Sequence, residues 1–397
     1  MNQTGLYWIW FSCLPFLRLT TRNELIDAFG GPEGVFHADE KKIATFRGIS
    51  SEMARIICST GLDRAYSIAD ECSRQGIDII TRDDSEYPFR LKNIYTPPSA
   101  LYVKGKLPHI DDSAVIAVIG TRKASQYGMR MGKRLAFEIS RCGGIVVSLL
   151  TAGVDRTAAE GALLAGESCV GVLGTSHEQE HSPLADEIAE NGALISEYPP
   201  GTSQLRSFFR DRNRIASGLS LGTVVVEAPE KSGTRYFVSE ALEQGKDIFA
   251  VPGNADSANS MGTLDLLKMG AKPVATGWDV MSEYAGMYPE LHYSDDKIPE
   301  LKSEFIPEKT ENRQKPDVSV INTNSAAESD WNLKTASLND EQKTIVSVIE
   351  NGASRIDEIM EKSTFPAPKV LSNLTILEIR GIIIRDLSGN IRLKKHF

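Results

Sequence analysis

The sequence predicts an α/β protein built on a parallel β-sheet, with a helical domain before it and a small winged helix after it. Three observations predict this fold class. Short apolar runs alternate with helical segments between residues 106 and 285. Several of these runs are continuous and rich in β-branched residues, as expected for strands buried on both faces. An acidic, proline-containing stretch then separates this region from the last 60 residues.

Residues 1–105 are predicted to form a helical domain of the SAM or helix-hairpin-helix type. Apolar segments of helical length alternate there with turns such as Gly30-Gly31-Pro32. The first segment, from Leu6, is predicted to be an amphipathic helix of a folded domain, because it lacks the basic region and cleavage site of a secretory signal. The segment 46–50 has the form of a helix-hairpin-helix turn, which packs helices or contacts a nucleic-acid backbone.

Residues 106–285 are predicted to form the sheet domain. Strands that alternate with helices indicate a parallel sheet covered by helices on both faces. The predicted strands are 114–120, 145–149, 168–174, 193–196, 223–227, 247–251 and 272–275. The predicted helices between them include 127–141, 157–165, 212–219 and 235–244.

Two further segments follow the sheet domain. Residues 286–337 contain ten acidic and six basic residues, four prolines and few large apolar side chains. Such a composition cannot bury enough surface to offset the entropy of ordering, so it predicts a flexible linker. Residues 338–397 are predicted to be a winged helix, because three helices (339–350, 354–362 and 367–380) precede two short strands around residues 388–390.

Composition indicates a cytoplasmic protein without a membrane span. No run of about 20 uncharged apolar residues occurs. The five cysteines are odd in number and share no CxxC spacing, which predicts neither disulfides nor a zinc site. The net charge of −9 argues against a basic coat over the whole surface. A local basic patch can still bind a phosphate backbone, because salt screens charges beyond about 10 Å.

The strongest site signal is Gly120-Thr121-Arg122, at the carboxyl end of the first predicted strand of this domain. Ligands of open α/β sheets bind there, where the next helix presents backbone N–H groups and a positive dipole end. Gly120 allows close approach of a ligand, Thr121 adds a hydroxyl donor and Arg122 can bind phosphate through two hydrogen bonds. The motif predicts a phosphate-binding loop; the alternative is a tight turn with a surface arginine.

A second signal is the segment from Arg206 to Arg214, whose four arginines and one aspartate give a charge of +3 over nine residues. Phe208 and Phe209 stand between the arginines. Guanidinium groups neutralise phosphates and aromatic rings stack on unpaired bases, so the segment predicts contact with a single-stranded nucleic acid. The alternative is that the phenylalanines anchor the core while the arginines pair with Glu197 or other acids.

With their neighbours, these segments resemble the DNA-processing protein A family, known as DprA or Smf. Their order and spacing match the family over most of the sheet domain, and the flanking helical domain and winged helix extend the match. The supporting stretches are Ser196-Glu197-Tyr198-Pro199-Pro200-Gly201, Arg212-Asn213-Arg214-Ile215-Ala216-Ser217-Gly218-Leu219-Ser220, Val226-Glu227-Ala228-Pro229-Glu230-Lys231-Ser232-Gly233 and Phe249-Ala250-Val251-Pro252-Gly253.

The resemblance implies a Rossmann-like homodimer that is not an enzyme and needs no cofactor or metal ion. It implies binding of single-stranded DNA, protection of incoming DNA in natural transformation, and assistance in loading the RecA recombinase. The predicted DNA- and phosphate-binding residues are Gly120, Thr121, Arg122, Arg206, Phe208, Phe209, Arg210, Arg212, Asn213, Arg214, Lys231 and Arg235.

The chain departs from the family pattern around one pocket. Residues 148–155 read Ser-Leu-Leu-Thr-Ala-Gly-Val-Asp where the family has Ser-Gly-Leu-Ala-Arg-Gly-Ile-Asp. Residues 233–237 read Gly-Thr-Arg-Tyr-Phe in place of Gly-Ser-Leu-Ile-Thr, and Leu264 stands where an asparagine is usual. The pocket is therefore remodelled, and Arg235 is a candidate to replace the arginine charge lost at Ala152.

Several enzyme signatures are excluded or left as alternatives. His177-Glu178-Gln179-Glu180-His181 matches zinc-protease patterns, but Gly174 and Pro183 predict a loop there instead of the required long helix. Neither GxGxxG nor a P-loop occurs, so no nucleotide cofactor is predicted. Two alternatives stay open: a nucleotide phosphoribohydrolase of the lysine-decarboxylase-like type, using Glu227 or Glu240, and a nucleotide-sensing scaffold that has lost DNA binding.

Overall fold

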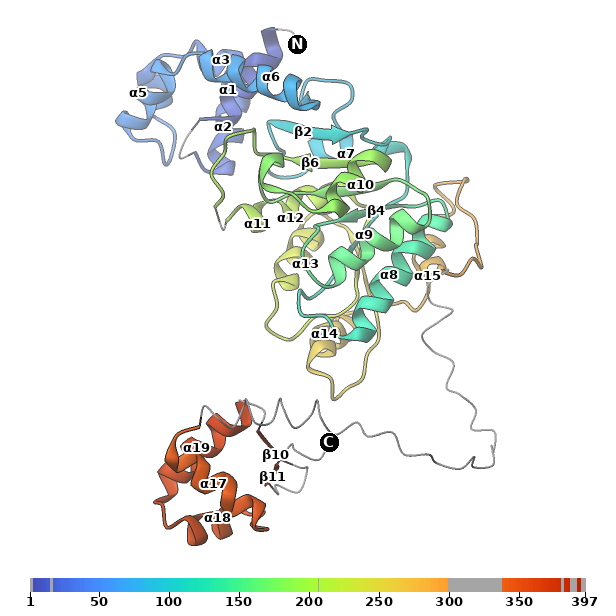
Figure 1. Cartoon of the computed structure of the whole chain (residues 1–397). Helices are drawn as coiled ribbons and strands as arrows, with labels where there is room; N and C mark the ends of the chain where they lie inside the picture. Colours follow the sequence, from blue (N-terminus) through green and yellow to red (C-terminus); the bar gives the residue numbers. More distant parts are fainter. Residues whose placement is uncertain are drawn as a thin grey trace. The chain divides into compact units, whose positions relative to one another are not determined.

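The computed structural model describes residues 3–14, 17–205, 207–298, 338–379, 382–385 and 391–393. The chain divides into two compact units, residues 1–307 and 308–397. Figure 1 shows that the first unit holds a helical module and the sheet, and that the second holds three helices and a short hairpin.

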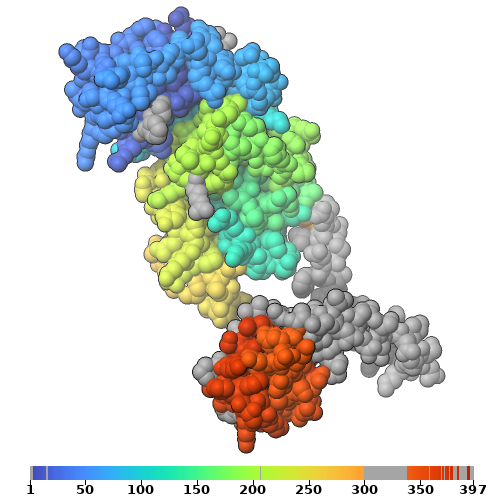
Figure 2. Space-filling view, turned by 60° about the vertical axis from the view of Figure 1, so that its left-hand side comes forward, coloured from blue at the N-terminus to red at the C-terminus, as the bar shows by residue number. Residues whose placement is uncertain are grey.

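The helical module occupies the start of the first unit. Its helices are α1 (Gln3–Ser12), α2 (Leu19–Phe29), α3 (Pro32–Phe36), α4 (Glu40–Ile43), α5 (Ser51–Ser59) and α6 (Asp63–Gln75). Figure 2 shows the module, in blue, lying directly against the green part of the chain that forms the sheet. The predicted hairpin turn at 46–50 joins α4 to α5, and Ser50 caps α5 by accepting from the Met53 N–H at 3.1 Å.

Helix α1 is buried from Gly5 to Phe11, so the prediction of an amphipathic helix is wrong. The other helices and the edge of the sheet cover it on all sides. Arg22 secures the chain at its end by donating to the carbonyls of Phe11 (2.8 Å), Ser12 (3.2 Å) and Leu14 (2.7 Å). This apolar helix is therefore the centre of a small hydrophobic core and does not lie on the surface of that core.

Among the described residues, nine strands form the sheet, in the order β1-β2-β6-β5-β4-β3-β7-β8-β9. The strands from β3 to β9 run parallel to one another, whereas β2 pairs antiparallel with both β1 and β6. All seven strands predicted between residues 106 and 285 are present, and the Rossmann-like fold class is confirmed. The strands are β1 (Ile77–Thr81), β2 (Ala100–Gly105), β3 (Val115–Ile119), β4 (Ile145–Ser148), β5 (Cys169–Val172), β6 (Ala193–Ser196), β7 (Gly222–Val225), β8 (Asp247–Ala250) and β9 (Lys272–Pro273).

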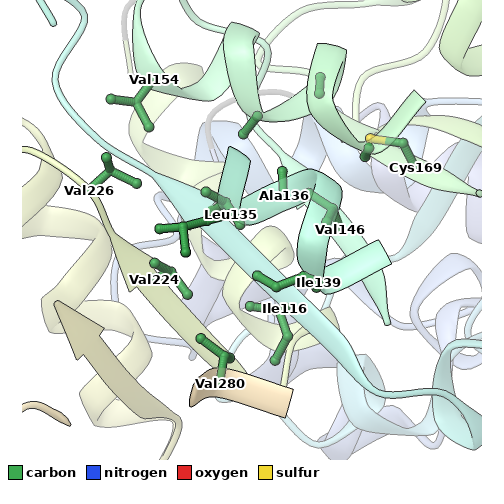
Figure 3. Close-up of a cluster of buried hydrophobic side chains, with 14 of the residues drawn as sticks. Ile116, Leu135, Ala136, Ile139, Val146, Val154, Cys169, Val224, Val226 and Val280 are labelled. Carbon is green, nitrogen blue, oxygen red and sulfur yellow. The ribbon is translucent and has the colours of Figure 1, made fainter. Parts of the chain in front are cut away.

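Helices cover both faces of this sheet, which explains the apolar strands. Ile116 and Val118 of β3 face one helical layer, while Val115, Ala117 and Ile119 face the other. Figure 3 shows the first core, where Ile116 and Val146 meet side chains of α8 and neighbouring elements. The first layer contains α8 (Gln126–Arg141), α9 (Val154–Leu164), α10 (Pro183–Asn191) and α15 (Gly277–Met281), and the second contains α7 (Phe89–Lys92), α12 (Asn213–Leu219) and α13 (Thr234–Glu243).

Shorter helices complete the first unit, and its boundaries differ from those predicted. The additional elements are η1 (Ile110–Asp112), η2 (His177–Gln179), α11 (Phe208–Asp211), η3 (Ala258–Ser260) and α14 (Met261–Lys268). Strands β1 and β2 belong to the region assigned to a helical domain, yet they extend the main sheet through pairing of β2 with β6. The helical module and the sheet domain therefore share one sheet.

The first residues of the predicted linker are also packed. Leu291 lies in the core beneath α8, and Ile298 packs against Phe137 and Ala165. The Asp296 carboxylate accepts a hydrogen bond from the Arg141 Nε at 2.7 Å. Apolar side chains spaced through an acidic stretch are enough to hold residues 286–298 on the sheet domain; residues 299–337 lie outside the described part.

The second unit has the order predicted for a winged helix, which confirms that part of the fold class. Asn339 caps the first helix by accepting from the Gln342 N–H at 2.8 Å. Ile345, Leu374 and Leu377 are among the buried side chains that join the helices. The elements are α17 (Asp340–Glu350), α18 (Ile356–Ser363), α19 (Ala367–Ile379), β10 (Ile383–Arg385) and β11 (Ile391–Leu393). The predicted turn at 388–390 lies outside the described residues.

Three features of the described residues bear on function. None of their helices has both the length and the apolar character needed to cross a membrane. No group of three or more His, Cys, Asp or Glu side chains is arranged to hold a metal ion within the same ranges. All five cysteines are free thiols, and three of them, Cys72, Cys142 and Cys169, are buried.

We expect Gly161→Ala to destabilise the protein, because α8 and α9 cross so closely that a Cβ at Gly161 would lie 2.1 Å from the Lys133 carbonyl oxygen. Overpacking of this kind costs about 1–3 kcal/mol, and urea denaturation would measure it. Gly286→Ala is the matched control, since nothing lies within 4 Å of its added carbon. Equal unfolding midpoints for the two variants would show that the helices can move apart freely.

Candidate nucleic-acid interface

The candidate site lies where the strand order reverses. β3 and β7 are neighbours, but β3 leads to α8 on one face of the sheet and β7 leads to α13 on the other. The loops that follow these two strands are the loop 120–125 and the chain from Glu227 onward. Open α/β sheets bind their ligands at this position, beyond the carboxyl ends of the strands.

The Gly120-Thr121-Arg122 motif lies at this edge of the sheet, but only Arg122 is exposed. A Cβ at Gly120 would lie 2.5 Å from Val154 Cγ2, so the glycine allows close packing of α9 rather than the approach of a ligand. The Thr121 side chain is buried, and its hydroxyl accepts from the Lys123 N–H at 3.3 Å. The predicted ligand contacts of Gly120 and Thr121 are thus replaced by contacts within the protein.

The amino-terminal end of α8 is already occupied by a side chain. Ser125 caps the helix by accepting from the Gly128 N–H at 3.1 Å. The buried Glu227 carboxylate accepts from the Ser125 N–H at 2.9 Å, from the Ser125 hydroxyl at 2.5 Å and from Asn259 Nδ2 at 3.2 Å. The N–H groups of Ser125 and Gly128, expected to be free for phosphate, are therefore bonded to the protein.

A second buried carboxylate, Asp155, holds the start of the same loop. One of its oxygens accepts from the Gly120 N–H at 3.1 Å and the other from the Thr151 hydroxyl. Burial raises the pKa of Asp155 to about 6, although these hydrogen bonds and the charges of Arg212 and Arg122 oppose the shift. Sequence reasoning did not include Asp155 in the site. The sequence signal for Asp155 was its position shortly after Gly153 in the remodelled segment, where a helix starts.

Leu150 lies within the remodelled segment, at a position where the family pattern also has leucine. Leu150 has a φ of 55°, an unfavourable backbone conformation for a leucine. Its side chain reaches Gly171, where an added Cβ would lie 2.9 Å from Leu150 Cδ1. Arg235 is exposed and donates to the Glu230 carbonyl at 3.3 Å, so its proposed compensation for Ala152 stays a prediction.

The arginine segment divides into buried and exposed members. Arg212 is 4% exposed and donates through Nη1 to the carbonyls of Leu149 (2.7 Å) and Val172 (3.1 Å), at the ends of β4 and β5. Burial lowers its pKa to about 10. Arg214 is also 4% exposed and forms an ion pair of 2.6 Å with Glu197.

The direct phosphate contacts expected of Arg212, Asn213 and Arg214 do not fit these positions, because all three side chains are buried. The alternative that the arginines pair with acids is confirmed for Arg214 and Glu197. Arg206 lies outside the described residues.

The exposed members of the segment lie beside aromatic rings. Phe208 stacks on Tyr198 with ring centroids 3.8 Å apart, which keeps it half-buried. Phe209 is 40% exposed and packs against Gly174, just beyond β5, with the buried Arg212 guanidinium 5.3 Å from its ring.

The exposed Arg210 guanidinium lies 4.4 Å from the centroid of the Tyr236 ring. Tyr236 itself is 53% exposed on α13. Tyr236 and Lys123 were not predicted as site residues, although both adjoin predicted ones.

We call the exposed set the cation–aromatic surface. Its cations and rings lie on three segments that follow the strands β3, β6 and β7: the β3–α8 loop, the stretch around α11, and the start of α13 with the loop before it. It consists of Arg122, Lys123, Phe209, Arg210, Lys231, Arg235 and Tyr236. Such a surface can neutralise a phosphate backbone and stack on bases.

The remaining enzyme candidates are not assembled into a catalytic centre. His177 is buried in a short 3-10 helix, with Nε2 2.8 Å from the Tyr102 carbonyl, while His181 is exposed. Glu240 is half-buried on α13, where burial and the neighbouring Glu243 raise its pKa. Glu227 is occupied by Ser125 and Asn259.

Comparisons with known proteins identify the family pattern. The model of the family "DNA recombination-mediator protein A" matches residues 78–285, and that of the "DprA winged helix domain" matches residues 332–389. DNA processing protein DprA of Bacillus subtilis is 38% identical over 213 residues, which cover 53% of this chain and 72% of that protein.

Two solved structures resemble the chain. DNA processing protein A from Streptococcus pneumoniae has 28% identity and a TM-score of 0.58, and the match covers 71% of this chain and 98% of that one. DNA processing protein A from Helicobacter pylori, which binds single-stranded DNA, has 26% identity and a TM-score of 0.47, with coverage of 54% and 98%.

We expect the stability of the wild type, relative to Asp155→Asn, to fall as the pH rises from about 4 to about 6. In this window Asp155 ionises in the unfolded chain, whereas in the folded protein its raised pKa of about 6 keeps it protonated. The full difference is on the order of 3 kcal/mol, and urea denaturation at several pH values would measure it.

Asp155→Ala is the control for this titration. It removes the acceptor for the Gly120 N–H and the Thr151 hydroxyl, so it is expected to be destabilised at every pH. A difference between wild type and Asp155→Asn that stays constant from pH 4 to pH 7 would contradict the assigned pKa.

Proposed function

The chain belongs to the DNA recombination-mediator protein A (DprA/Smf) family, and on this premise we propose that it performs its DNA-processing role by binding single-stranded DNA on the cation–aromatic surface. The observation that carries the proposal is the Arg210–Tyr236 pair beside the exposed Phe209. Cations and accessible ring faces alternate there at the carboxyl edge of the sheet.

The chemistry of this surface favours an unpaired strand. Phe209 and Tyr236 can stack only on bases whose faces are accessible, and a duplex keeps its base faces stacked on one another. Arg122 and Lys123 can contact phosphates, which carry no sequence information. Binding is therefore proposed to be strong for single strands, insensitive to base sequence and weakened by salt.

The proposed cellular role follows the family. We propose that the bound strand is protected during natural transformation and recombination and is passed to RecA, which would supply the ATP-dependent step. We also propose a cytoplasmic location, which the five free thiols support, because a reducing compartment keeps cysteines unpaired.

A homodimer is also proposed. Leu242 and Met269 are exposed apolar side chains beside a cavity of about 220 Å³ between α13 and α14. Large exposed apolar side chains are typical of surfaces that become covered by another molecule.

The proposal assigns no enzymatic reaction to the chain. A phosphoribohydrolase would need a carboxylate free to stabilise a positively charged sugar. The Glu227 carboxylate already accepts hydrogen bonds from three donors on Ser125 and Asn259, and this supports a binding role over that alternative.

We expect the double variant Arg122→Ala, Arg210→Ala to bind single-stranded DNA more weakly for every sequence tested. Each phosphate that is no longer neutralised should reduce the slope of log affinity against log salt by about 0.7. Fluorescence anisotropy of a labelled oligonucleotide at several salt concentrations would measure both effects.

Arg74→Ala is the matched control, because Arg74 is exposed on α6 and paired with Asp70 and Glu71, outside the cation–aromatic surface. An affinity and salt slope of the double variant equal to those of Arg74→Ala would contradict the assignment of the surface. Absence of binding by the wild type at low salt would contradict single-stranded-DNA binding altogether.

We expect Tyr236→Ala to lose about 1–3 kcal/mol of binding free energy, because one stacked base loses its platform. Tyr236→Phe keeps the ring and its contact with Arg210, so it should bind within about two-fold of the wild type. The same anisotropy titration compares the variants. Equal losses for Phe and Ala would mean that the hydroxyl, and not the ring, makes the contact.

A further inference from the structure

We propose that Glu227 is an internal anion that takes the place of a phosphate at the start of α8 and thereby determines which anions the site accepts. This inference rests on the proposed function and specifies the ligand class. The site would select an extended phosphodiester strand over inorganic phosphate or a free mononucleotide. The hydrogen-bond partners of this one carboxylate and the shape of the recess that holds it support the selection.

The Glu227 carboxylate has the hydrogen bonds that a bound anion would have. The Ser125 N–H (2.9 Å) and hydroxyl (2.5 Å) donate to it from the helix side, and Asn259 Nδ2 (3.2 Å) donates from the opposite loop. The residue is 3% exposed, so water is largely absent from these contacts. α8 is 16 residues long, and the positive end of its dipole favours a negative charge at this point.

A glycine makes room for the carboxylate. A Cβ at Gly128, in the first turn of α8, would lie 2.3 Å from Glu227 Oε2 and 2.4 Å from its carboxyl carbon. No larger residue fits there while Glu227 keeps its place. The first turn of α8 therefore accommodates the Glu227 carboxylate only because residue 128 has no side chain.

The same contacts position the exposed cations. Asn259 Nδ2 also lies 3.2 Å from the Lys123 carbonyl, and the Thr121 N–H donates to the Glu227 carbonyl at 2.8 Å. Glu227 thus holds the loop that carries Arg122 and Lys123 to the chain after β7, through both its backbone carbonyl and its side chain. Glu227 acts on the ligand through this loop and is a positioning residue.

The consequence is a preference for ligands with many phosphates. A single phosphate at this edge of the sheet would meet the negative Glu227 where other open sheets present free N–H groups. The phosphate would then be attracted by the surface cations, which lie on separate segments. Each of them is in contact with water and therefore attracts a phosphate only weakly by itself. A strand with a phosphate on every nucleotide can contact several of them at once, and a mononucleotide cannot.

The test is a titration of inorganic phosphate into full-length wild type, Glu227→Ala and Glu227→Gln at constant ionic strength, followed by calorimetry. Glu227→Ala frees the Ser125 N–H, the Ser125 hydroxyl and Asn259, so we expect phosphate affinity about ten-fold or more above that of the wild type. Glu227→Gln is the matched control, because it removes the charge but still fills the recess, and it should not gain the site. Circular dichroism would check that each variant is folded.

If Glu227→Ala does not fold, Glu227→Ser carries the test, because its short polar side chain also withdraws the carboxylate and leaves space for the ion. Phosphate binding to the wild type as tight as to the Ala or Ser variant would overturn the proposal, as would no gain in a folded variant. The titration contains no DNA. If the wild type did not bind single-stranded oligonucleotide, the proposed function would be contradicted. The phosphate titration would still test the role of Glu227 separately.

Discussion

The reversal of strand order between β3 and β7 is the constraint on which the site depends. Because the two strands lead to helices on opposite faces, polar backbone groups of the following loops are left at their carboxyl ends without partners in the sheet. Asp155 and Glu227 satisfy those groups from the two sides. The loop that bears Arg122 is consequently fixed at its start and at its end, and its cations project from a rigid base.

Buried charged side chains support the exposed cations of the cation–aromatic surface. Burying a charged side chain costs several kcal/mol unless polar partners surround it, and two buried arginines near the site have such partners. Arg212 bonds the carbonyls that end β4 and β5, and Arg214 pairs with Glu197. These side chains hold the ends of the strands and the following helices together. The aromatic rings and cations above them therefore have defined positions before any ligand arrives.

The sequence was sufficient to predict the parallel strands, because continuous apolar runs rich in β-branched residues, such as Val115–Ile119, are typical of strands buried on both faces. β2 was not predicted, because its pairing with β6 joins segments some ninety residues apart. No local sequence pattern indicates that pairing.

The arginine segment shows a different limit. Arg210 and Arg212 are two residues apart, about 200° around a helix, and only Arg210 is exposed. Arg212 is buried because carbonyls at the ends of β4 and β5 accept its hydrogen bonds. Glu227 was considered for chemistry only as a carboxylate that could stabilise a positively charged sugar, since its partners Ser125 and Asn259 lie far away in sequence.

The antiparallel pair β1 and β2 has a consequence for how the chain can be divided. A fragment beginning after residue 105 would lose both strands and turn β6 into an edge. The backbone groups of β6 that now pair with Tyr102–Gly105 would face solvent as a template for another chain. Such a fragment would tend to associate through its sheet, whereas a cut that keeps β1 and β2 leaves the native edge in place.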